Sequence, residues 1–341
     1  MRIIRVFIAI SIFILLYCSI AVAGGECPMH STLSTSTTSD GKLGLQFQYE
    51  YTYMKTLREG ASSVSQDEVL DDQINAGAMK YTVPAKMVMK KYTLAANYMP
   101  TDKLQLMLTL PYVVNDMDMR MAMVGSMGMI MKKDMKMDTV DGLGDMTLMG
   151  LYTLYSDAPV KPTTSLSAGL GIKMPTGQND VRKTNGELVH ASMQPGSGSW
   201  DPIFLINAMH SMKPVSLQFN GMYHLTTKGD EGYEFGDMIG ADIIVRYQAM
   251  ESINLGLGLN FIHTGKDKDH DNKYSSPDTS LIDNTENTGI TAFYLSPEVR
   301  VRFLNTGGSL MLSFQKPIYQ HVNGIQQVVD WRAMASLMWA F

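Results

Sequence analysis

A period-two alternation of apolar and polar residues, repeated about twelve times, is the feature that most constrains how this chain can fold. In segment 104–112, leucine or tyrosine stands at every even position and Gln, Met, Thr or Pro at every odd position. Successive side chains of a strand point to opposite faces, so this period predicts strands with one apolar face. No stretch of 18 consecutive apolar residues follows residue 24, so no transmembrane helix is predicted there. The twelve predicted strands lie at 43–52, 92–99, 104–112, 142–155, 163–174, 200–210, 215–225, 238–248, 252–263, 291–303, 308–316 and 327–341.

The connections between the predicted strands alternate between short and long. Short turns on one side and long loops on the other are typical of an antiparallel up-and-down β-barrel in an outer membrane, whose long loops lie outside the cell. A soluble β-sandwich would also alternate, but it would bury its apolar face between two sheets and need no export signal. We therefore predict an all-β transmembrane barrel of about 12 strands. The short connections lie near 100–102, 156–162, 211–214, 249–252 and 305–307, and the long ones near 55–85, 114–141, 175–198, 227–236, 265–290 and 317–326.

The last predicted strand has the length and the aromatic residues that a membrane crossing requires. At roughly 3.3 Å per residue and a tilt of about 40°, the segment from Trp331 to Phe341 spans about 25 Å, the height of the apolar band of such barrels. Trp331 and the pair Trp339 and Phe341 would then lie at the two interfaces, where aromatic residues gather. We expect this strand to contact outer-membrane lipid and, through the terminal Phe341, the barrel-assembly machinery.

The N-terminal segment has the pattern of an export signal. Arg2 and Arg5 precede an apolar run at 6–17, and residues 21–23 have the small-x-small pattern of a signal-peptidase site. This pattern predicts export through the Sec pathway to the outer membrane of a Gram-negative bacterium. The formal charge of −5 argues against nucleic acid as a partner. The predicted domains are a signal peptide at 1–23, a flexible segment at 24–41, and a barrel at 42–341 with a Met-rich extracellular loop at 114–141.

The polar positions of the predicted strands face the lumen and contain no recognisable catalytic constellation. None of the seven histidines stands in a Ser/His or H-E-x-x-H arrangement, so we predict that the chain is not an enzyme. A twelve-stranded barrel has a narrow lumen, so its charged side chains either pair with one another or form a path for a solute. The titratable residues that we predict to face the lumen are Glu50, Asp145, Lys173, Asp201, His224, Asp242, Arg246, Glu298, Arg300, Arg302, Asp330 and Arg332.

Methionine is the unusual part of the composition. The chain has 29 methionines, of which sixteen fall between residues 79 and 149 and nine between residues 117 and 137. All nine stand at odd positions, and the odd positions of strand 104–112 face the lumen. If the strand continues, Met117 to Met123 point inward over the mouth of the barrel, and the segment from Met127 onward returns beside them. On the neighbouring strand, Met87 and Met89 share the inward parity.

Thioether sulfur is a soft, uncharged ligand that suits Cu(I) and, by the same softness, Ag(I). Several such ligands within exchange range would bind an ion weakly enough to let it leave. Three other interpretations stay open: the methionines contact an apolar solute, fill flexible apolar surface, or form an oxidisable shield. No cofactor is required in any of them. The candidate metal ligands are Met87, Met89, Met117, Met119, Met121, Met123, Met127, Met129, Met131, Met135 and Met137, with Cys27, Met29 and His30 near the start of the exported chain.

Three Gly-rich segments resemble the outer-membrane family of the MetA pathway of phenol degradation. They are residues 141–145, opening one strand, residues 169–177, closing another, and residues 194–201, entering the next. Glycine at strand edges permits tight bends and close approach of the backbone. The resemblance covers most of the chain from about residue 42 to Phe341, and it implies a barrel that passes small, often hydrophobic compounds. The Met-rich segment departs from the family pattern and is similar in composition to copper-resistance outer-membrane proteins.

Together these patterns predict an outer-membrane channel or binding barrel that passes or captures a small solute. In the first interpretation its Met-rich mouth contacts soft metal ions such as Cu(I). In the alternative, the protein is a passive uptake channel for small hydrophobic or aromatic compounds, and the methionines line an apolar path.

Overall fold

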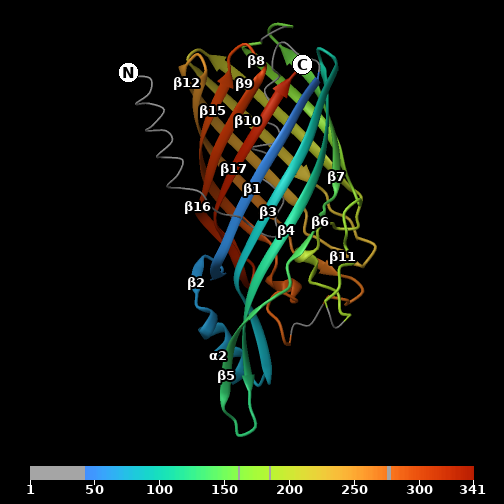
Figure 1. Ribbon diagram of the computed structural model, residues 1–341, viewed down its shortest axis with the longest axis vertical. Coiled ribbons are helices and arrows are strands. Elements are labelled where there is room, and N and C mark those ends of the chain that lie inside the picture. The colour runs from blue at the N-terminus through green and yellow to red at the C-terminus, as the bar shows by residue number, and fades with distance from the viewer. Residues whose placement is uncertain (1–42, 160–161, 184–185, 275–277) are drawn as a thin grey trace.

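The computed structural model describes residues 43–159, 162–183, 186–274 and 278–341, which form a closed antiparallel barrel (Figure 1). Each barrel strand pairs with its neighbours in chain order, and the last strand pairs with the first. The predicted twelve-stranded transmembrane barrel is therefore confirmed. Its strands are β1 (Leu43–Glu59), β3 (Lys80–Thr101), β4 (Leu104–Val124), β7 (Met146–Ser156), β8 (Thr164–Met174), β9 (Asp201–Met212), β10 (Val215–His224), β12 (Met238–Met250), β13 (Ile253–Thr264), β15 (Ile290–Phe303), β16 (Gly308–Val322) and β17 (Ile325–Ala340).

The barrel closes between its first and last strands. β1 and β17 pair from Gly44 opposite Ala340 onward, and the N–H of Phe341 donates to the carbonyl of Leu43 at 2.8 Å. Closure satisfies backbone groups that water cannot reach in a bilayer.

No helix in the described part of the chain is long and apolar enough to span a membrane.

The pairing of β16 with β17 stops at Gln315. Pro317, two residues further along, has no N–H to donate to the ladder. Beyond it a side chain replaces the missing backbone contact, because Nε2 of Gln320 donates to the carbonyl of Val329 at 2.9 Å. The outer halves of these two strands are therefore joined by a side chain.

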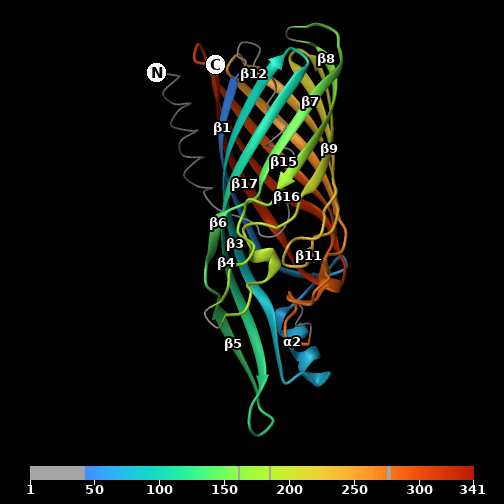
Figure 2. The ribbon, with the colours of Figure 1, turned by 90° about the vertical axis from the view of Figure 1, so that its right-hand side faces the viewer.

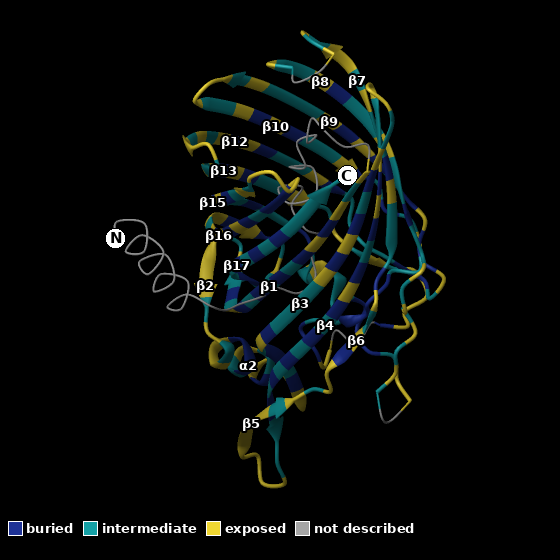
Figure 3. Cartoon of the chain, turned by 45° about the horizontal axis from the view of Figure 1, so that its top comes forward, coloured by how far each residue is buried: buried dark blue, intermediate teal, exposed yellow. Residues whose placement is uncertain are grey.

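Alternation along the strands separates a lipid-facing surface from the lumen. Leu106 and Leu108 are 36% and 38% exposed, whereas Met107 between them is 3% exposed. The same banding of buried and exposed residues runs along the strands in Figure 3. The outward side chains are mostly apolar, as contact with hydrocarbon requires.

Two strands continue far beyond the barrel on the long-loop side, where a Met-rich loop was expected. β4 runs to Val124 and pairs with β5 (Ile130–Lys136), while β6 (Val140–Leu143) pairs with β4 nearer the barrel. Figures 1 and 2 show this hairpin projecting from the end opposite the C-terminus. The segment 114–141 is thus largely strand rather than loop, because the alternation of methionines with polar residues continues through it.

Helix α2 (Gln66–Asn75) covers the outer face of this projection, with β2 (Ser62–Val64) just before it. Ser65 caps the helix in a capping box with Glu68. Arg120 of β4 lies 3.1 Å from Asp67, and Lys132 of β5 lies 2.8 Å from Asp71. The polar side of the hairpin is therefore held against a helix. The apolar core beneath α2 includes Leu57, Val69, Leu70, Tyr81, Val83 and Ala122.

The remaining long loops fold over and into the same end of the barrel. They contain the short helices η1 (Ala191–Met193) and η2 (Thr285–Asn287), and the paired strands β11 (Tyr233–Glu234) and β14 (Lys268–Asp269). Ala191, Tyr233 and Tyr274 pack together in a small core that joins three of these loops. The loops therefore shape the lumen from within.

Candidate functional site

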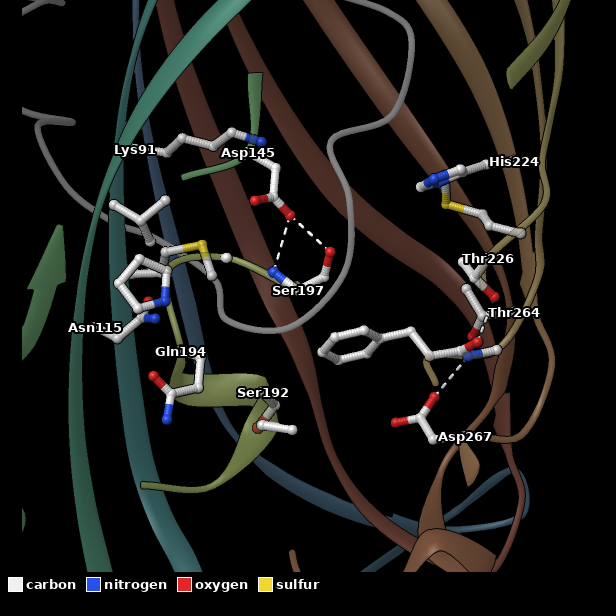
Figure 4. A pocket seen from close by; sticks show the side chains of 18 of the residues that line it. Lys91, Asn115, Asp145, Ser192, Gln194, Ser197, His224, Thr226, Thr264 and Asp267 are labelled. Atoms are coloured by element: carbon white, nitrogen blue, oxygen red, sulfur yellow. Dashed lines mark hydrogen bonds between the residues drawn. The ribbon is translucent and has the colours of Figure 1, made fainter. Parts of the chain in front are cut away.

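A cavity of about 430 Å³ lies inside the barrel against the inner faces of β1, β3 and β4. Figure 4 shows Lys91 and Asn115 on one side of it and His224, Thr226, Thr264 and Asp267 on the opposite side. Apolar and polar side chains both line the cavity along its length. Toward the long loops they are Met54, Pro84, Met87, Met89, Met117, Ile282 and Ile290 with Asn115, Gln194, Gln326 and Gln327, and toward the short turns Gln46, Gln48, Thr93, Thr109 and Thr147 with Met149, Ile203, Leu205 and Met222.

Four methionines lie in a single row at the long-loop side of the barrel, which we call the methionine row: Met54, Met87, Met117 and Met137. Met54 on β1 is opposite Met87 on β3, and Met87 is opposite Met117 on β4. Met137, just after β5, donates its N–H to the carbonyl of Met117 at 2.9 Å. Met54, Met87 and Met117 are at most 8% exposed. The row therefore runs across four neighbouring segments on the lumen side.

Further methionines surround the row and make one apolar cluster. Met119 and Met135 are opposite each other on β4 and β5, one step further from the barrel. Met193 approaches from the loop and is fully buried, and Met89 packs against the same cluster. Eight of the seventeen residues of this cluster are methionine. The cluster is therefore an apolar surface in which nearly half of the side chains are thioethers.

The structure divides the candidate metal ligands into groups. Met87, Met89, Met117, Met119, Met135 and Met137 belong to the cluster, and Met121 is also buried. Met127, Met129 and Met131 at the tip of the hairpin are 87%, 61% and 51% exposed, and Met123 is half-buried beside them. The hairpin tip therefore lies apart from the cavity. Cys27, Met29 and His30, with the predicted signal peptide, lie outside the described residues.

The three segments that carry the family resemblance meet at one carboxylate. Asp145 accepts hydrogen bonds from the N–H of Gly177 at 3.0 Å and from the N–H and Oγ of Ser197 at 2.8 and 2.6 Å, the latter two drawn in Figure 4. A Cβ on Gly196 would stand 2.6 Å from the backbone of Gly177, so only glycine permits this approach. The motif therefore fixes both ends of loop 175–199 at the barrel wall.

Between these ends the loop enters the lumen and helps to enclose the cavity. Nδ2 of Asn115 donates to the carbonyl of Met193 at 3.0 Å. The side chain of Gln194 accepts from the N–H of Val181 and donates to the carbonyls of Val181 and Val189, each at 3.0 Å. These contacts hold η1 against β4, where it buries Met193.

His190, at the start of η1, is buried among groups from three loops. Its Nδ1 accepts from the N–H of Ser192 at 3.2 Å and lies 2.8 Å from the Oγ of Ser192, so the imidazole caps the short helix. Its Nε2 lies 3.7 Å from Asp283. Burial lowers the pKa of His190 to about 4 and raises the pKa of Asp283 to about 6. At neutral pH the imidazole is therefore neutral and the carboxylate ionised.

Most of the predicted lumen residues lie inside the barrel and pair with one another. Lys173 is 2.6 Å from Asp201 and 3.9 Å from Asp145, and His224 is 3.5 Å from Asp201. A second set fills the lumen away from the cavity. It comprises the contacts of Arg332 with Glu50 at 3.4 Å, Arg246 with Glu298 at 2.5 Å, Asn260 with Asp242 at 2.7 Å, and Arg300 with Met311 at 3.6 Å.

Two of the predicted lumen residues bond to backbone groups. Arg302 is exposed at the short-turn end, where it donates to the carbonyl of Glu251. Asp330 sits at a register shift between β1 and β17 and accepts from the N–H of Lys55 at 2.6 Å and from Thr56. Its carboxylate takes the place of a ladder partner there.

Two buried methionines of the cluster were missing from the predicted metal ligands. Met54 continues the inward parity of Gln46, Gln48, Glu50 and Thr52, so the alternation rule could have identified it. Met193 lies in a loop, and no local pattern indicates that it enters the lumen.

Comparison with known proteins supports the architecture. The fold is similar to that of the COG4313 outer membrane channel from Pseudomonas putida F1, with a TM-score of 0.55 and 14% identity over 95% of this chain and 100% of the channel. The CymD monoaromatic hydrocarbon channel gives a TM-score of 0.47 with 12% identity over 94% of this chain and 95% of that one. The Pseudomonas putida toluene transporter TodX gives 0.45 with 10% identity over 95% and 99%.

At 14% identity the COG4313 channel shows the fold alone, that of an outer-membrane barrel. No curated protein matches the sequence. Residues 58–283, more than half of the chain, match the family described as "Putative MetA-pathway of phenol degradation". The three segments that meet at Asp145 lie within this match, and the chain belongs to that family.

Proposed function

We propose that this protein is a passive channel that admits small aromatic compounds through the outer membrane. The observation that carries the proposal is the Met-lined cavity inside a closed barrel. Small-molecule sites are mostly apolar and occupy about 300–1,000 Å³, a range that includes this cavity. The family description, which refers to phenol degradation, points to the same class of compound.

Methionine suits an aromatic solute for a physical reason. A thioether contacts the edge of an aromatic ring with a gain of about 0.3–1.5 kcal/mol, and its flexible chain adapts to rings of different shape. Aliphatic side chains such as leucine offer similar volume without this contact. The cluster therefore favours rings over saturated compounds of equal size.

Apolar contacts continue along the length of the cavity. A compound arriving from the long-loop end first meets Met87, Met117 and Ile290 and later meets Met149, Ile203 and Leu205 beside Thr93 and Thr109. An apolar ring therefore keeps apolar neighbours as it advances, and the hydroxyl groups interrupt the apolar surface between them. This series of contacts is that expected of a path for an apolar solute.

The chemistry of the lining favours a channel over an enzyme. The contact between Ser192 and His190 is a helix cap, and the carboxylates of Asp145 and Asp201 are bonded to a backbone N–H and to a lysine, respectively.

We also propose, from the sequence, that export uses the Sec pathway and that Phe341 is recognised during insertion.

The test is uptake of labelled toluene by Gram-negative cells whose outer membrane contains the protein. Ala95 is 5% exposed and lines the cavity opposite Gln46 and Thr109. We expect Ala95→Trp to lower the initial uptake rate to that of cells without the protein, because the indole fills the path. Equal uptake by the variant and the wild type would refute the proposal.

The neighbouring residue supplies the control. Leu94 is 58% exposed on the lipid face of the same strand. Leu94→Trp adds a similar ring outside the barrel and should leave uptake unchanged. The amounts of both variants in the membrane are compared by heat-modifiable gel mobility.

A further inference from the structure

The methionine row brings thioethers from four chain segments to the same level of the lumen. Cross-strand pairing makes Met54, Met87 and Met117 direct neighbours, and Met137 is bonded through its backbone to Met117. All four belong to the same cluster as Met119 and Met193. Their grouping is a property of strand register, because the residues come from positions 54 to 137.

The spacing of the row fits a shared metal ion. Neighbouring strands lie about 4.7–4.9 Å apart, and the Cβ atoms of directly opposed residues lie about 4.5–5.5 Å apart. A metal–sulfur bond is about 2.3 Å, so two sulfurs on one ion are at most about 4.6 Å apart. Flexible methionine side chains on adjacent strands therefore need little rearrangement to hold one ion between them. Met54 and Met117 lie two strands apart, so their side chains must both bend toward Met87 to share its ion.

The surroundings select the kind of ion. The described part of the chain holds no group of three His, Cys, Asp or Glu residues suited to a metal. A divalent ion would bring two charges among the apolar side chains of the cluster. A soft monovalent ion brings one, and thioethers are among its preferred ligands.

We propose that the methionine row is a binding site for a soft monovalent cation, for which Cu(I) is the probe. The ion is held by thioethers of Met54, Met87 and Met117, with Met119, Met137 or Met193 within reach as a further ligand. The exposed methionines of the hairpin tip are not part of the site. This inference goes beyond aromatic uptake, because it requires sulfur rather than apolar volume.

The test is competition for Cu(I) between the refolded full-length barrel and a chromophoric chelator under anaerobic conditions. One variant carries Met54→Leu, Met87→Leu and Met117→Leu, which keeps bulk and removes three sulfurs. The matched control carries Met127→Leu, Met129→Leu and Met131→Leu at the exposed tip. Heat-modifiable gel mobility and circular dichroism show that each barrel is folded.

We expect the wild type and the tip variant to compete equally and the row variant to lose at least tenfold in affinity. X-ray absorption of the bound copper should show sulfur ligands and no nitrogen. The proposal is overturned if the folded wild type does not compete. It is equally overturned if the folded row variant keeps its affinity, since the ion would then be held elsewhere, for example by Cys27. Greater or equal loss in the tip variant also overturns it.

Discussion

At the scale of single residues, the use of methionine in place of leucine is the main chemical choice in this lumen. The cluster around Met87 and Met117 is as buried as an ordinary core, and leucine would fill it with similar volume. Sulfur adds polarisability, and the unbranched chain adds freedom of rotation. Both properties favour a surface that contacts changing ligands over one that packs in a single way.

The residue scale gives a prediction about selectivity. In the variant with Met54→Leu, Met87→Leu and Met117→Leu, we expect the ratio of toluene uptake to methylcyclohexane uptake to fall by about 2- to 10-fold, because ring–sulfur contacts of about 0.3–1.5 kcal/mol are lost. Initial rates in cells measure the ratio. The exposed-tip variant with leucine at 127, 129 and 131 should keep the wild-type ratio. An unchanged ratio in the row variant would show that thioethers do not select rings.

At the scale of elements, loop 175–199 connects the family motif to the cavity. Its ends are tied to Asp145, and η1 is held by Asn115 and by the buried pair of His190 and Asp283. The two buried groups respond to pH in opposite directions. His190, with its pKa lowered, favours docking above about pH 6.5, and this contribution is lost as the pH falls toward 4. Asp283, with its pKa raised, favours docking below about pH 4, and this contribution is lost as the pH rises through 6.

This opposition predicts different pH profiles for two variants. Between pH 6.5 and 4.5 the wild type should change little, because the two contributions offset each other. In Asp283→Asn only the contribution of the histidine remains, so docking of η1 should weaken by roughly 1–3 kcal/mol as the pH falls. In His190→Gln only the contribution of the carboxylate remains, so docking should strengthen over the same range. Hydrogen exchange of the amides of Val189 and Met193, corrected for intrinsic rates, measures docking, and parallel profiles in both variants would contradict the assignment.

The elements also show how far sequence reasoning reaches. Period-two alternation identified all twelve barrel strands, because facing lipid or lumen is decided residue by residue along one strand. The same parity placed Met87, Met117 and Met119 inward. Continued beyond residue 113, this parity also placed the segment from Met127 onward beside Met117 to Met123, although segment 114–141 as a whole was expected to be a loop. The helix was also missed, although Ser65 and Glu68 form a capping box that is visible in the sequence.

The parts that could not be predicted depend on long-range contacts. Met193 is buried because Asn115, 78 residues earlier, donates to its carbonyl. Asp330 bonds to the backbone of β1 because a register shift between the first and last strands leaves N–H groups there for its carboxylate. Neither event leaves a local pattern, since each is decided by how distant segments meet.

At the scale of the whole molecule, the lumen is filled from two sides. Paired charges occupy the wall formed by β12, β13, β15 and β17, and the inserted loop lies in the lumen against β4. What is left is the cavity along β1, β3 and β4. A barrel of this strand number therefore conducts through a narrow, lined path rather than an open pore.

Removing the loop should open that path. Gly196 donates its N–H to the carbonyl of Gln178 at 2.8 Å, so the ends of segment 179–195 already lie side by side. Replacing this segment with two glycines should raise single-channel conductance in planar bilayers several-fold, because the narrow lumen loses its plug. Replacing the hairpin tip 126–131, which projects beyond the barrel, should leave the conductance unchanged. A loop-deleted barrel with wild-type conductance would show that the constriction lies elsewhere.

In the proposed channel, the succession of thioethers and hydroxyls along the cavity would act as a short chromatographic column rather than as a sieve. A compound is sorted by how long each stretch of wall retains it, and compounds that partition most strongly into the first stretch also leave it most slowly. Throughput then levels off once the retaining stretch is occupied, at an external concentration set by that retention. Selectivity and speed are thereby opposed within one channel, and the number of methionines on the wall sets the balance between them.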